Sequence, residues 1–569
     1  MIKNYEFDII DNIKYLFILF LSFNLVLSIF IFFEILSYKV CVSIFFFFYL
    51  YLFLLSLINL KRNISYLYFI LFFSIYWLIF FVPAINAHDD LSSYLVFAEK
   101  FIDMGSIPEE TLSIRRSYNL GGSFLFKGIL SKFDPNYLSF FEPVLGIILI
   151  SILILSSNIN ASKKFLSLSL LMFCPFLGSK ILLNTEPAFM MSFFSLVLMI
   201  LVHDYKNKKD NSIVSPLIFF TLIPLIYRPT TFLFNILILT GFFYYLLKVN
   251  QKKISALKIL FSKKNIIIYV IIIIIFYPFI LSSFKSSGTF IYPILGKGWQ
   301  NESVIFSDYP LNYYNSIKNL EDIIYFLKIL FLDNFFLPLI IIVGIGLYLR
   351  EKDKIYLFIV FCFILNCLAI SFSIGVTWVM RYSFPIFLSV MLFFIISYKK
   401  ELYISKKFLN LSFISLIIFG LGIYFTVGEK VNLKRNNSKF LGYNKNLISQ
   451  INQLDKQINF TDKLLVNSIF SLAIYKSGFK NIVIYDTPLV MQPWIKDNEN
   501  LDDFGKFERE FVKYYKSLNI DYFISDHIVH KNQKTFYRLI NNNFELLFNK
   551  NLDTPQVHDL KLYIYILKR

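Results

Sequence analysis

Long apolar runs, each bounded by a short polar segment, are the dominant pattern along the 569 residues of this chain. A membrane-spanning helix needs about 20 apolar residues, because it must cross a hydrocarbon core about 30 Å thick. The pattern therefore predicts an α-helical polytopic membrane protein with about 13 transmembrane helices. The predicted spans begin near Tyr15, Val40, Tyr66, Phe140, Phe165, Glu186, Ile213, Thr230, Asn265, Asp322, Ile355, Thr377 and Phe408.

The hydrophobic pattern changes after residue 428. We expect residues 1–428 to form a transmembrane domain with outer loops at 86–139 and 285–320, and the Asn- and Lys-rich stretch 429–446 to be a linker. Residues 447–569 alternate short β-prone runs with helical patterns, which is typical of a small α/β domain. The expected strands are Leu464–Val466, Ile482–Tyr485, Tyr522–Ser525 and Leu562–Leu567, and the expected helices are Phe504–Leu518 and Phe536–Ile540.

Composition agrees with a membrane protein. Hydrophobic residues make up 57% of the chain and charged residues 17%, whereas soluble domains are roughly 45–50% apolar. The net charge of +18 is compatible with nucleic-acid binding, but the basic residues form short clusters between apolar runs, so no nucleic-acid partner is expected. The four cysteines lie inside apolar runs without metal-ligand spacing and are expected to be apolar fillers.

Basic clusters occupy alternate loops, and only Lys39 lies in a short turn of the other set. Because Lys and Arg are retained on the cytoplasmic side, this alternation predicts a cytoplasmic N-terminus and a C-terminal domain outside the cytoplasm. The clusters are Lys61-Arg62, Lys163-Lys164, Lys206–Lys209, Lys248–Lys264, Arg350–Lys354 and Lys399–Lys407. The loops expected outside are Ile85–Tyr137, Asn184–Glu186, Arg228-Pro229, Lys285–Leu320 and Gly375-Val376.

Two adjacent carboxylates, Asp89 and Asp90, directly follow a predicted span at the outer surface. An aspartate there can accept a proton from an attacking hydroxyl group or bind a divalent cation. Glu186 stands in a short turn on the same side, so Asp89 and Glu186 are the candidate ligands for a cation such as Mg²⁺ or Mn²⁺. The alternatives are a helix cap for the aspartates and an ordinary membrane-edge residue for Glu186.

Polar and basic residues of the outer loops are candidates for substrate binding. Guanidinium groups suit phosphate recognition, although arginines at a membrane edge also reach toward lipid headgroups. Arginines in or beside a span usually have a partner or line a pathway. Trp, Tyr and Lys also serve as ordinary interface anchors. The candidates are His88, Tyr94, Arg115, Arg116, Arg228, Lys285, Lys297, Trp299, Arg381 and Tyr382.

The many spans, the acidic pair that opens the first outer loop, the Arg381-Tyr382-x-x-Pro385 sequence and the terminal α/β domain resemble the GT-C superfamily of integral-membrane glycosyltransferases. The segments His88–Tyr94, Arg115–Gly122 and Ser287–Gly298 look like a bacterial branch of that group. The resemblance implies a sugar donor attached to a polyprenyl phosphate, with Asp89 and Asp90 as the acidic residues of the first loop and Glu186 as that of the second. Two spans precede the span that leads to the acidic loop, whereas the family commonly has none before it.

These features predict an inverting glycosyltransferase of the bacterial cytoplasmic membrane that moves a sugar from a polyprenyl-phosphate donor to a glycan, lipid or protein outside the cytoplasm. Asp89 is the expected base or metal-positioning residue, and Asp90 and Glu186 are expected to assist it. Apart from a divalent cation, no cofactor is expected. The alternatives are an O-antigen polymerase or ligase and a transporter of lipid-linked oligosaccharides. The chain has no P-loop, which disfavours an ATP-driven pump.

Overall fold

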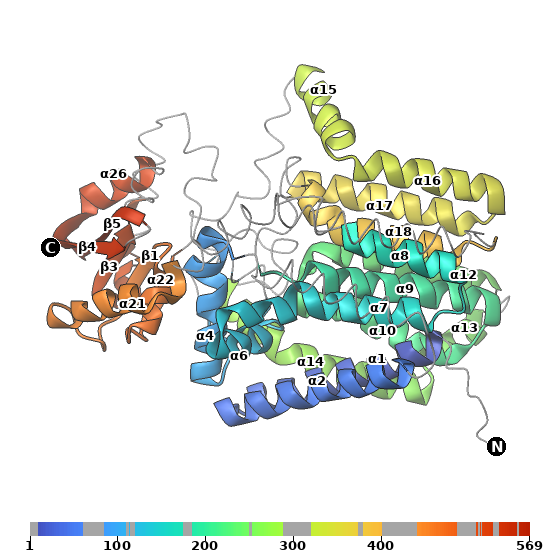
Figure 1. The fold of residues 1–569 in the computed structure, drawn as a ribbon, viewed down its shortest axis with the longest axis horizontal. Helices are drawn as coiled ribbons and strands as arrows, with labels where there is room; N and C mark the ends of the chain where they lie inside the picture. Colours follow the sequence, from blue (N-terminus) through green and yellow to red (C-terminus); the bar gives the residue numbers. More distant parts are fainter. Residues whose placement is uncertain are drawn as a thin grey trace. The chain divides into compact units, whose positions relative to one another are not determined.

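The computed structural model describes residues 9–60, 85–109, 113, 116, 120–173, 185–249, 253–287, 320–373, 379–400, 441–485, 508–509, 512–513, 515–526, 534–554 and 557–568. The chain forms two compact units (Figure 1). Unit 1 consists of Met1–Pro83, Asn136–Pro278 and Asn319–Val431. Unit 2 consists of Ala84–Pro135, Phe279–Lys318 and Asn432–Arg569.

Eight of the described helices are long and apolar enough to cross a membrane. Each coincides with one of the predicted spans, so the structure supports a multi-pass membrane protein. These segments are Ile9–Phe32, Tyr38–Ile58, Pro135–Ser156, Ala188–Lys208, Pro229–Lys248, Lys263–Ser286, Lys354–Ser371 and Val379–Ser397.

The other predicted spans either differ from a single long helix or fall outside the described residues. The run near Asp322 is a pair of helices bent by 64°, and the run near Ile213 is the shorter apolar segment Asn211–Tyr227. Helix α8 (Ala161–Phe173) covers the start of the run near Phe165. The runs near Tyr66 and Phe408 lie outside the described residues. The described residues thus hold eight spans, or nine if the bent pair counts as one, and the predicted total of about 13 stays a prediction.

Helix α9 (Ala188–Lys208) is the central helix of unit 1. Every residue from Ala188 to Leu201 is buried, as is typical of a helix that is apolar on all sides. It packs against α18 (Val379–Ser397), α7 (Gly146–Ser156) and α10 (Val214–Leu222), and Figure 1 shows α7, α8, α9 and α18 running alongside one another. Phenylalanines fill much of this core. Phe194 of α9, for example, meets Phe20 of α1 (Ile9–Phe32) edge to face, with ring centroids 5.2 Å apart.

Unit 1 has further helices outside this core. They are α2 (Tyr38–Leu60), α11 (Pro224–Tyr227), α12 (Phe232–Val249), α13 (Lys253–Leu260), α14 (Lys263–Ser287), α15 (Leu320–Lys328), α16 (Phe336–Glu351) and α17 (Lys354–Ser373). Short 3₁₀ and π segments connect several of them: η2 (Pro135–Phe140), η3 (Phe141–Leu145), η5 (Asn211–Ile213), η6 (Pro229–Thr231) and η8 (Ile329–Asp333). The end of α14, from Phe279 onward, belongs to unit 2.

Close packing of α7 on α9 depends on Gly146. A Cβ atom at this position would collide with the backbone of Phe189 and Met190, and backbone atoms cannot move aside as the end of a side chain can. We expect Gly146→Ala to destabilise the protein by about 1–3 kcal/mol, the usual effect of overpacking a core. Thermal unfolding of the purified protein in detergent measures this change as a lower Tm.

Gly346 provides the matched control for this prediction. It lies in α16, and a Cβ atom there would meet no described heavy atom within 4 Å. Because alanine favours a helix over glycine by about 1 kcal/mol, Gly346→Ala is expected to leave the Tm unchanged or slightly raised. An equal loss of stability in both variants would contradict the packing explanation.

Unit 2 contains a five-stranded sheet of order β2-β1-β3-β5-β4. Its strands are β1 (Leu464–Asn467), β2 (Ile482–Ile484), β3 (Tyr522–Asp526), β4 (Phe544–Thr554) and β5 (Val557–Leu567). Strand β1 pairs in parallel with β2 and β3, whereas β5 pairs antiparallel with β3 and β4. The four predicted strands coincide with β1, β2, β3 and β5, while β4 was not predicted. The helices of this region are α21 (Lys445–Asn452), η11 (Gln453–Lys456), α22 (Ser471–Lys476) and α26 (Lys534–Asn543).

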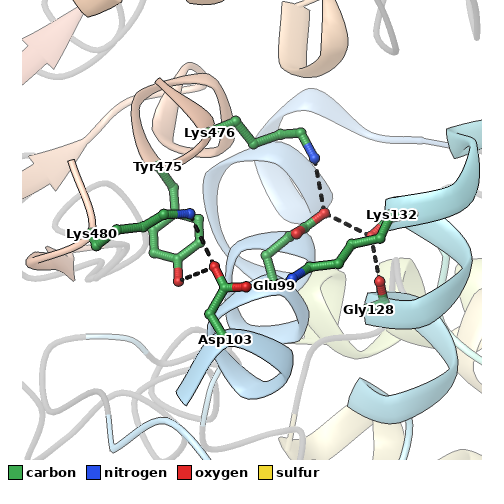
Figure 2. A network of polar contacts seen from close by, with 8 residues as sticks. Glu99, Asp103, Gly128, Lys132, Tyr475, Lys476 and Lys480 are labelled. Carbon is green, nitrogen blue, oxygen red and sulfur yellow. Dashed lines mark hydrogen bonds and ion pairs between the residues drawn. The ribbon is translucent and has the colours of Figure 1, made fainter. Parts of the chain in front are cut away.

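Polar contacts join this sheet region to the segment 84–135 of the same unit (Figure 2). Asp103, on α4 (Leu95–Met104), accepts hydrogen bonds of 3.0 Å from the Tyr475 hydroxyl and from Lys480 Nζ, and it pairs with Lys132 of α6 (Phe124–Phe133). Partial burial would raise the pKa of Asp103, but the two lysines bring it below its ordinary value of 3.8. The Asp103 carboxyl group is therefore ionised at neutral pH.

A second set of contacts, beside Asp103, includes buried groups. Lys476 Nζ lies 3.0 Å from Glu99 Oε1, which also accepts a hydrogen bond of 2.8 Å from the Ser131 hydroxyl. The buried Lys100 donates a hydrogen bond of 2.5 Å to the backbone oxygen of Ile482, in β2. Buried charges require such partners. The first predicted outer loop and the chain's C-terminal region are thus held together within one unit.

Candidate functional site

Several predicted site residues of unit 1 meet at the N-terminal end of α9. The aromatic ring of Tyr382 lies between two guanidinium groups: that of Arg228 is 5.3 Å from the ring centroid and that of Arg381 is 5.6 Å away. Arg381 and Tyr382 lie in the first turn of α18, and Arg228 immediately precedes η6, which packs against α18. Two positive charges on one tyrosine ring form an arrangement that can hold an anion.

Proline residues explain why the helical conformation breaks at Arg228 and at Glu142. Arg228 precedes Pro229 and has extended backbone angles (φ −164°, ψ 122°), and Glu142 precedes Pro143 with φ −135° and ψ 117°. A proline ring disfavours helical geometry in the residue before it. In both places the residue before proline therefore leaves the helical conformation at a break between helical segments.

Glu142 is a site residue that the sequence analysis missed. It is 4% exposed, and its Oε1 accepts a hydrogen bond of 3.1 Å from the backbone N–H of Phe189, in the first turn of α9. It interacts electrostatically with Arg228 and Glu186. Its other oxygen, Oε2, is buried and has no hydrogen-bond partner among the described residues. The repeated dipeptide Glu-Pro, at 142-143 and again at 186-187, was the available signal.

Glu186 lies beside this group and is 4% exposed. It precedes Pro187 and α9, and its backbone oxygen accepts a hydrogen bond of 2.9 Å from Ala188 N. The N-terminus of a helix carries a partial positive charge, which favours carboxylates at this position. Two carboxylates and two guanidinium groups thus lie around the start of α9 and the start of α18. We call Glu142, Glu186, Arg228, Arg381 and Tyr382 the helix-end cluster.

The turn before Arg228 is anchored to the core of unit 1. The buried Tyr227 donates a hydrogen bond of 3.2 Å to Asn24 of α1, and Asn24 donates one of 2.7 Å to the backbone oxygen of Phe20. Phe189 of α9 meets Phe384 of α18 edge to face, with centroids 5.6 Å apart. Side chains held by buried packing of this kind can keep the charged groups in fixed positions.

The predicted acidic pair lies in unit 2, on the π-helical segment η1 (Ala87–Tyr94). Asp90 is fully buried and its Oδ2 accepts a hydrogen bond of 2.8 Å from Asn86 N, whereas Asp89 is half-buried and bonded to Asn86 Nδ2 at 3.0 Å. The segment η1 packs against α22. Single π-helical turns occur frequently at functional sites.

The other predicted residues have varied surroundings in unit 2. Tyr94 is nearly buried, with the buried Lys127 5.2 Å from its ring centroid. Arg116 is fully buried and donates hydrogen bonds of 2.7 Å to Pro108 O and to the Ser282 hydroxyl, a geometry that favours a structural role. Lys285 forms an exposed ion pair of 2.9 Å with Glu109. Arg115, Lys297, Trp299 and the side chain of His88 lie outside the described residues.

Asp89 and Glu186 belong to different units, so the convergence expected of these two carboxylates stays a prediction. The expected cation also stays a prediction. Among the residues that the structure describes, there is no group of three or more His, Cys, Asp or Glu side chains close enough to hold a metal ion.

Comparison with models of known protein families and with curated proteins finds no match to this chain. Any function must therefore be argued from the residues themselves.

Proposed function

We propose that this protein is a membrane glycosyltransferase that takes a sugar from a polyprenyl phosphate and transfers it, with inversion, to a hydroxyl group outside the cytoplasm. The observation that carries the proposal is the helix-end cluster, in which Arg228 and Arg381 flank Tyr382 beside the buried carboxyl group of Glu142. The cluster combines cationic groups with an unpaired hydrogen-bond acceptor. The proposed substrate, a sugar linked to a polyprenyl phosphate, carries both a phosphate group and hydroxyl groups.

The two arginines support binding of the donor phosphate. A guanidinium group presents several N–H donors in a plane and stays charged, so it matches phosphate oxygens better than an ammonium group does. During transfer, the bond between the sugar carbon and the phosphate oxygen breaks, and the phosphate gains negative charge. Cationic groups already in place stabilise that charge without reorganisation. Arg228 and Arg381 are the residues that we assign to this role.

Glu142 supports recognition of the sugar. A buried carboxyl oxygen without a partner costs free energy, so Oε2 benefits from a hydrogen-bonding group that arrives with the substrate. A sugar hydroxyl group, which can both donate and accept, is such a group. Glu186 lies near enough to interact electrostatically with Glu142 and shares this role.

Asp89 is the residue that we propose as general base. The acceptor oxygen forms a bond to the sugar carbon as the phosphate leaves, and the hydroxyl proton passes to the carboxylate. Asp89 is half-buried, whereas Asp90 is fully buried and bonded to the backbone of Asn86. Of the two aspartates, Asp89 is therefore the more exposed.

The test compares the lipid-linked sugars of cells with and without this protein by mass spectrometry. Loss of a transferase leaves its donor unused, so we expect one polyprenyl-phosphate-linked sugar to accumulate and one sugar to disappear from an extracytoplasmic product. Expression of the intact chain should restore both.

The same experiment separates the alternatives. Accumulation of a complete oligosaccharide on a polyprenyl diphosphate would instead indicate a polymerase, ligase or transporter. An unchanged pool of lipid-linked sugars would contradict the proposal.

A further inference from the structure

A cavity of about 360 Å³ lies at the end of α9 farther from the helix-end cluster. Helix α9 has 21 residues, and at about 1.5 Å per residue it separates its two ends by about 30 Å. The cavity is lined by His203 and Asp204 in the last turns of α9, by Tyr398 and Lys399 after α18, and by Asn160 and Lys163 at the start of α8. Its volume is typical of small-ligand sites.

Basic residues dominate the charged groups of this cavity. Lys163 is 5% exposed, and its ammonium group lies 5.4 Å from the centroid of the Tyr398 ring and donates a hydrogen bond to the Tyr398 backbone oxygen. Lys399 also lines the cavity and is exposed. Arg350 lies on the same tyrosine ring, 5.1 Å from its centroid, so a third positive charge stands nearby.

Two further features favour a negatively charged ligand. Asn160 caps the 13-residue helix α8, whose positive N-terminal end opens onto the cavity. The hydroxyl group of Tyr398, a residue 8% exposed, is buried and has no hydrogen-bond partner among the described residues. A tyrosine hydroxyl can donate a hydrogen bond to a ligand oxygen.

Acidic residues at this end of α9 form ion pairs with lysines of the same helix. Asp204 forms an ion pair of 3.0 Å with Lys208 on the next turn of α9. Nearby, Asp353 forms a pair of 2.5 Å with Lys206. Asp204 and Asp353 are therefore each paired with a lysine of α9.

We propose that this cavity binds a phosphate group, separate from the substrate of the helix-end cluster, through Lys163, Lys399 and the Tyr398 hydroxyl. An anionic lipid headgroup and free inorganic phosphate present the same chemistry. The apolar side chain of Leu166 lies exposed on α8, less than one turn beyond Lys163. Basic pockets at the ends of membrane helices commonly hold anionic headgroups.

The experiment titrates the full-length protein in detergent with phosphatidylglycerol and, separately, with phosphatidylcholine, and counts bound lipids by native mass spectrometry. We expect selective binding of phosphatidylglycerol, weakened at least tenfold by Lys399→Gln and weakened severalfold by Tyr398→Phe. Neither substitution removes buried side-chain volume, because Lys399 is exposed and phenylalanine at position 398 keeps the aromatic ring. The matched control is Lys354→Gln, an exposed lysine outside the cavity lining, and it should leave binding unchanged.

Competition with inorganic phosphate tells whether the cavity binds free phosphate or a lipid headgroup. If millimolar phosphate displaces phosphatidylglycerol from the wild type, and loses this effect in Lys399→Gln, the site accepts free phosphate. If phosphate has no effect, the site takes the lipid headgroup. Equal phosphatidylglycerol binding by the wild type, Lys399→Gln and Tyr398→Phe would overturn the proposal.

Discussion

Replacing both arginines that flank Tyr382 is expected to weaken binding of a polyprenyl phosphate by about 100-fold or more. Each hydrogen bond to a charged group contributes about 1.5–3 kcal/mol, and about 1.4 kcal/mol corresponds to a factor of ten in Kd. The double variant Arg228→Gln/Arg381→Gln removes both positive charges while keeping side chains of similar length. Titration of the purified full-length protein with a polyprenyl phosphate, followed by native mass spectrometry, measures the change.

Two further variants sharpen this test. Tyr382→Phe keeps the ring on which both guanidinium groups lie, so binding should change little, whereas Tyr382→Ala removes that support and should weaken it. Arg509→Gln is the matched control, because Arg509 is an exposed arginine of unit 2. Equal affinity in the double variant and in Arg509→Gln would exclude the arginine pair from phosphate binding.

The second large effect is expected from Asp89. A positioned general base contributes about 10²- to 10⁴-fold to a rate, and asparagine has nearly the same shape but cannot take the proton. Asp89→Asn should therefore lower transfer by about this factor and leave binding of a polyprenyl phosphate unchanged. The readout is the rate at which cells expressing the variant clear the accumulated lipid-linked sugar.

Asp455→Asn controls for the chemical change itself, since Asp455 is an exposed aspartate in the same unit. It should restore transfer fully to cells that lack the protein. If Asp89→Asn did the same, Asp89 would not be the base, although the role of the arginines would still stand.

Much of unit 1 could be predicted because membrane spans obey simple rules of length and polarity. Eight described helices match predicted runs. The spacing of basic loops predicted that Lys163, Lys206, Arg350 and Lys399 share one side of the membrane. In the structure, Lys163 and Arg350 meet at Tyr398, and Lys206 pairs with Asp353. Which side of the membrane this end faces stays a prediction.

The candidate site could be predicted in part. Arg228, Arg381 and Glu186 were identified from charge beside a span, and Tyr382 from the sequence Arg381-Tyr382-x-x-Pro385. These four residues gather at one end of the bundle. Glu142 was missed because a single acidic residue within an apolar run resembles a helix boundary. Its importance comes from contact with the first turn of α9, 47 positions later in the sequence, and no local pattern specifies that contact.

Strand β4 and the bent helix pair were not predicted, for different reasons. Strand β4 contains the polar stretch Asn549–Asn551, so its local preference for a strand is weak, and pairing with β5 determines its conformation. The bend of 64° between Ile323–Phe331 and Phe336–Glu351 falls at the polar pair Asp333-Asn334, which the sequence analysis included within a single predicted span. Arg116 donates hydrogen bonds to Pro108 and Ser282, and its expected role in binding substrate stays a prediction.

The most direct test of the proposed lipid-phosphate site is photolabelling. The full-length protein in detergent would be irradiated with a polyprenyl phosphate that carries a photoreactive group beside the phosphate, and labelled peptides would be mapped by mass spectrometry. Labelling is expected in peptides that contain Arg228 and Arg381-Tyr382, and an excess of unlabelled polyprenyl phosphate should prevent it. Labelling that spares both peptides, or that persists in the presence of the competitor, would contradict a polyprenyl-phosphate site at the helix-end cluster.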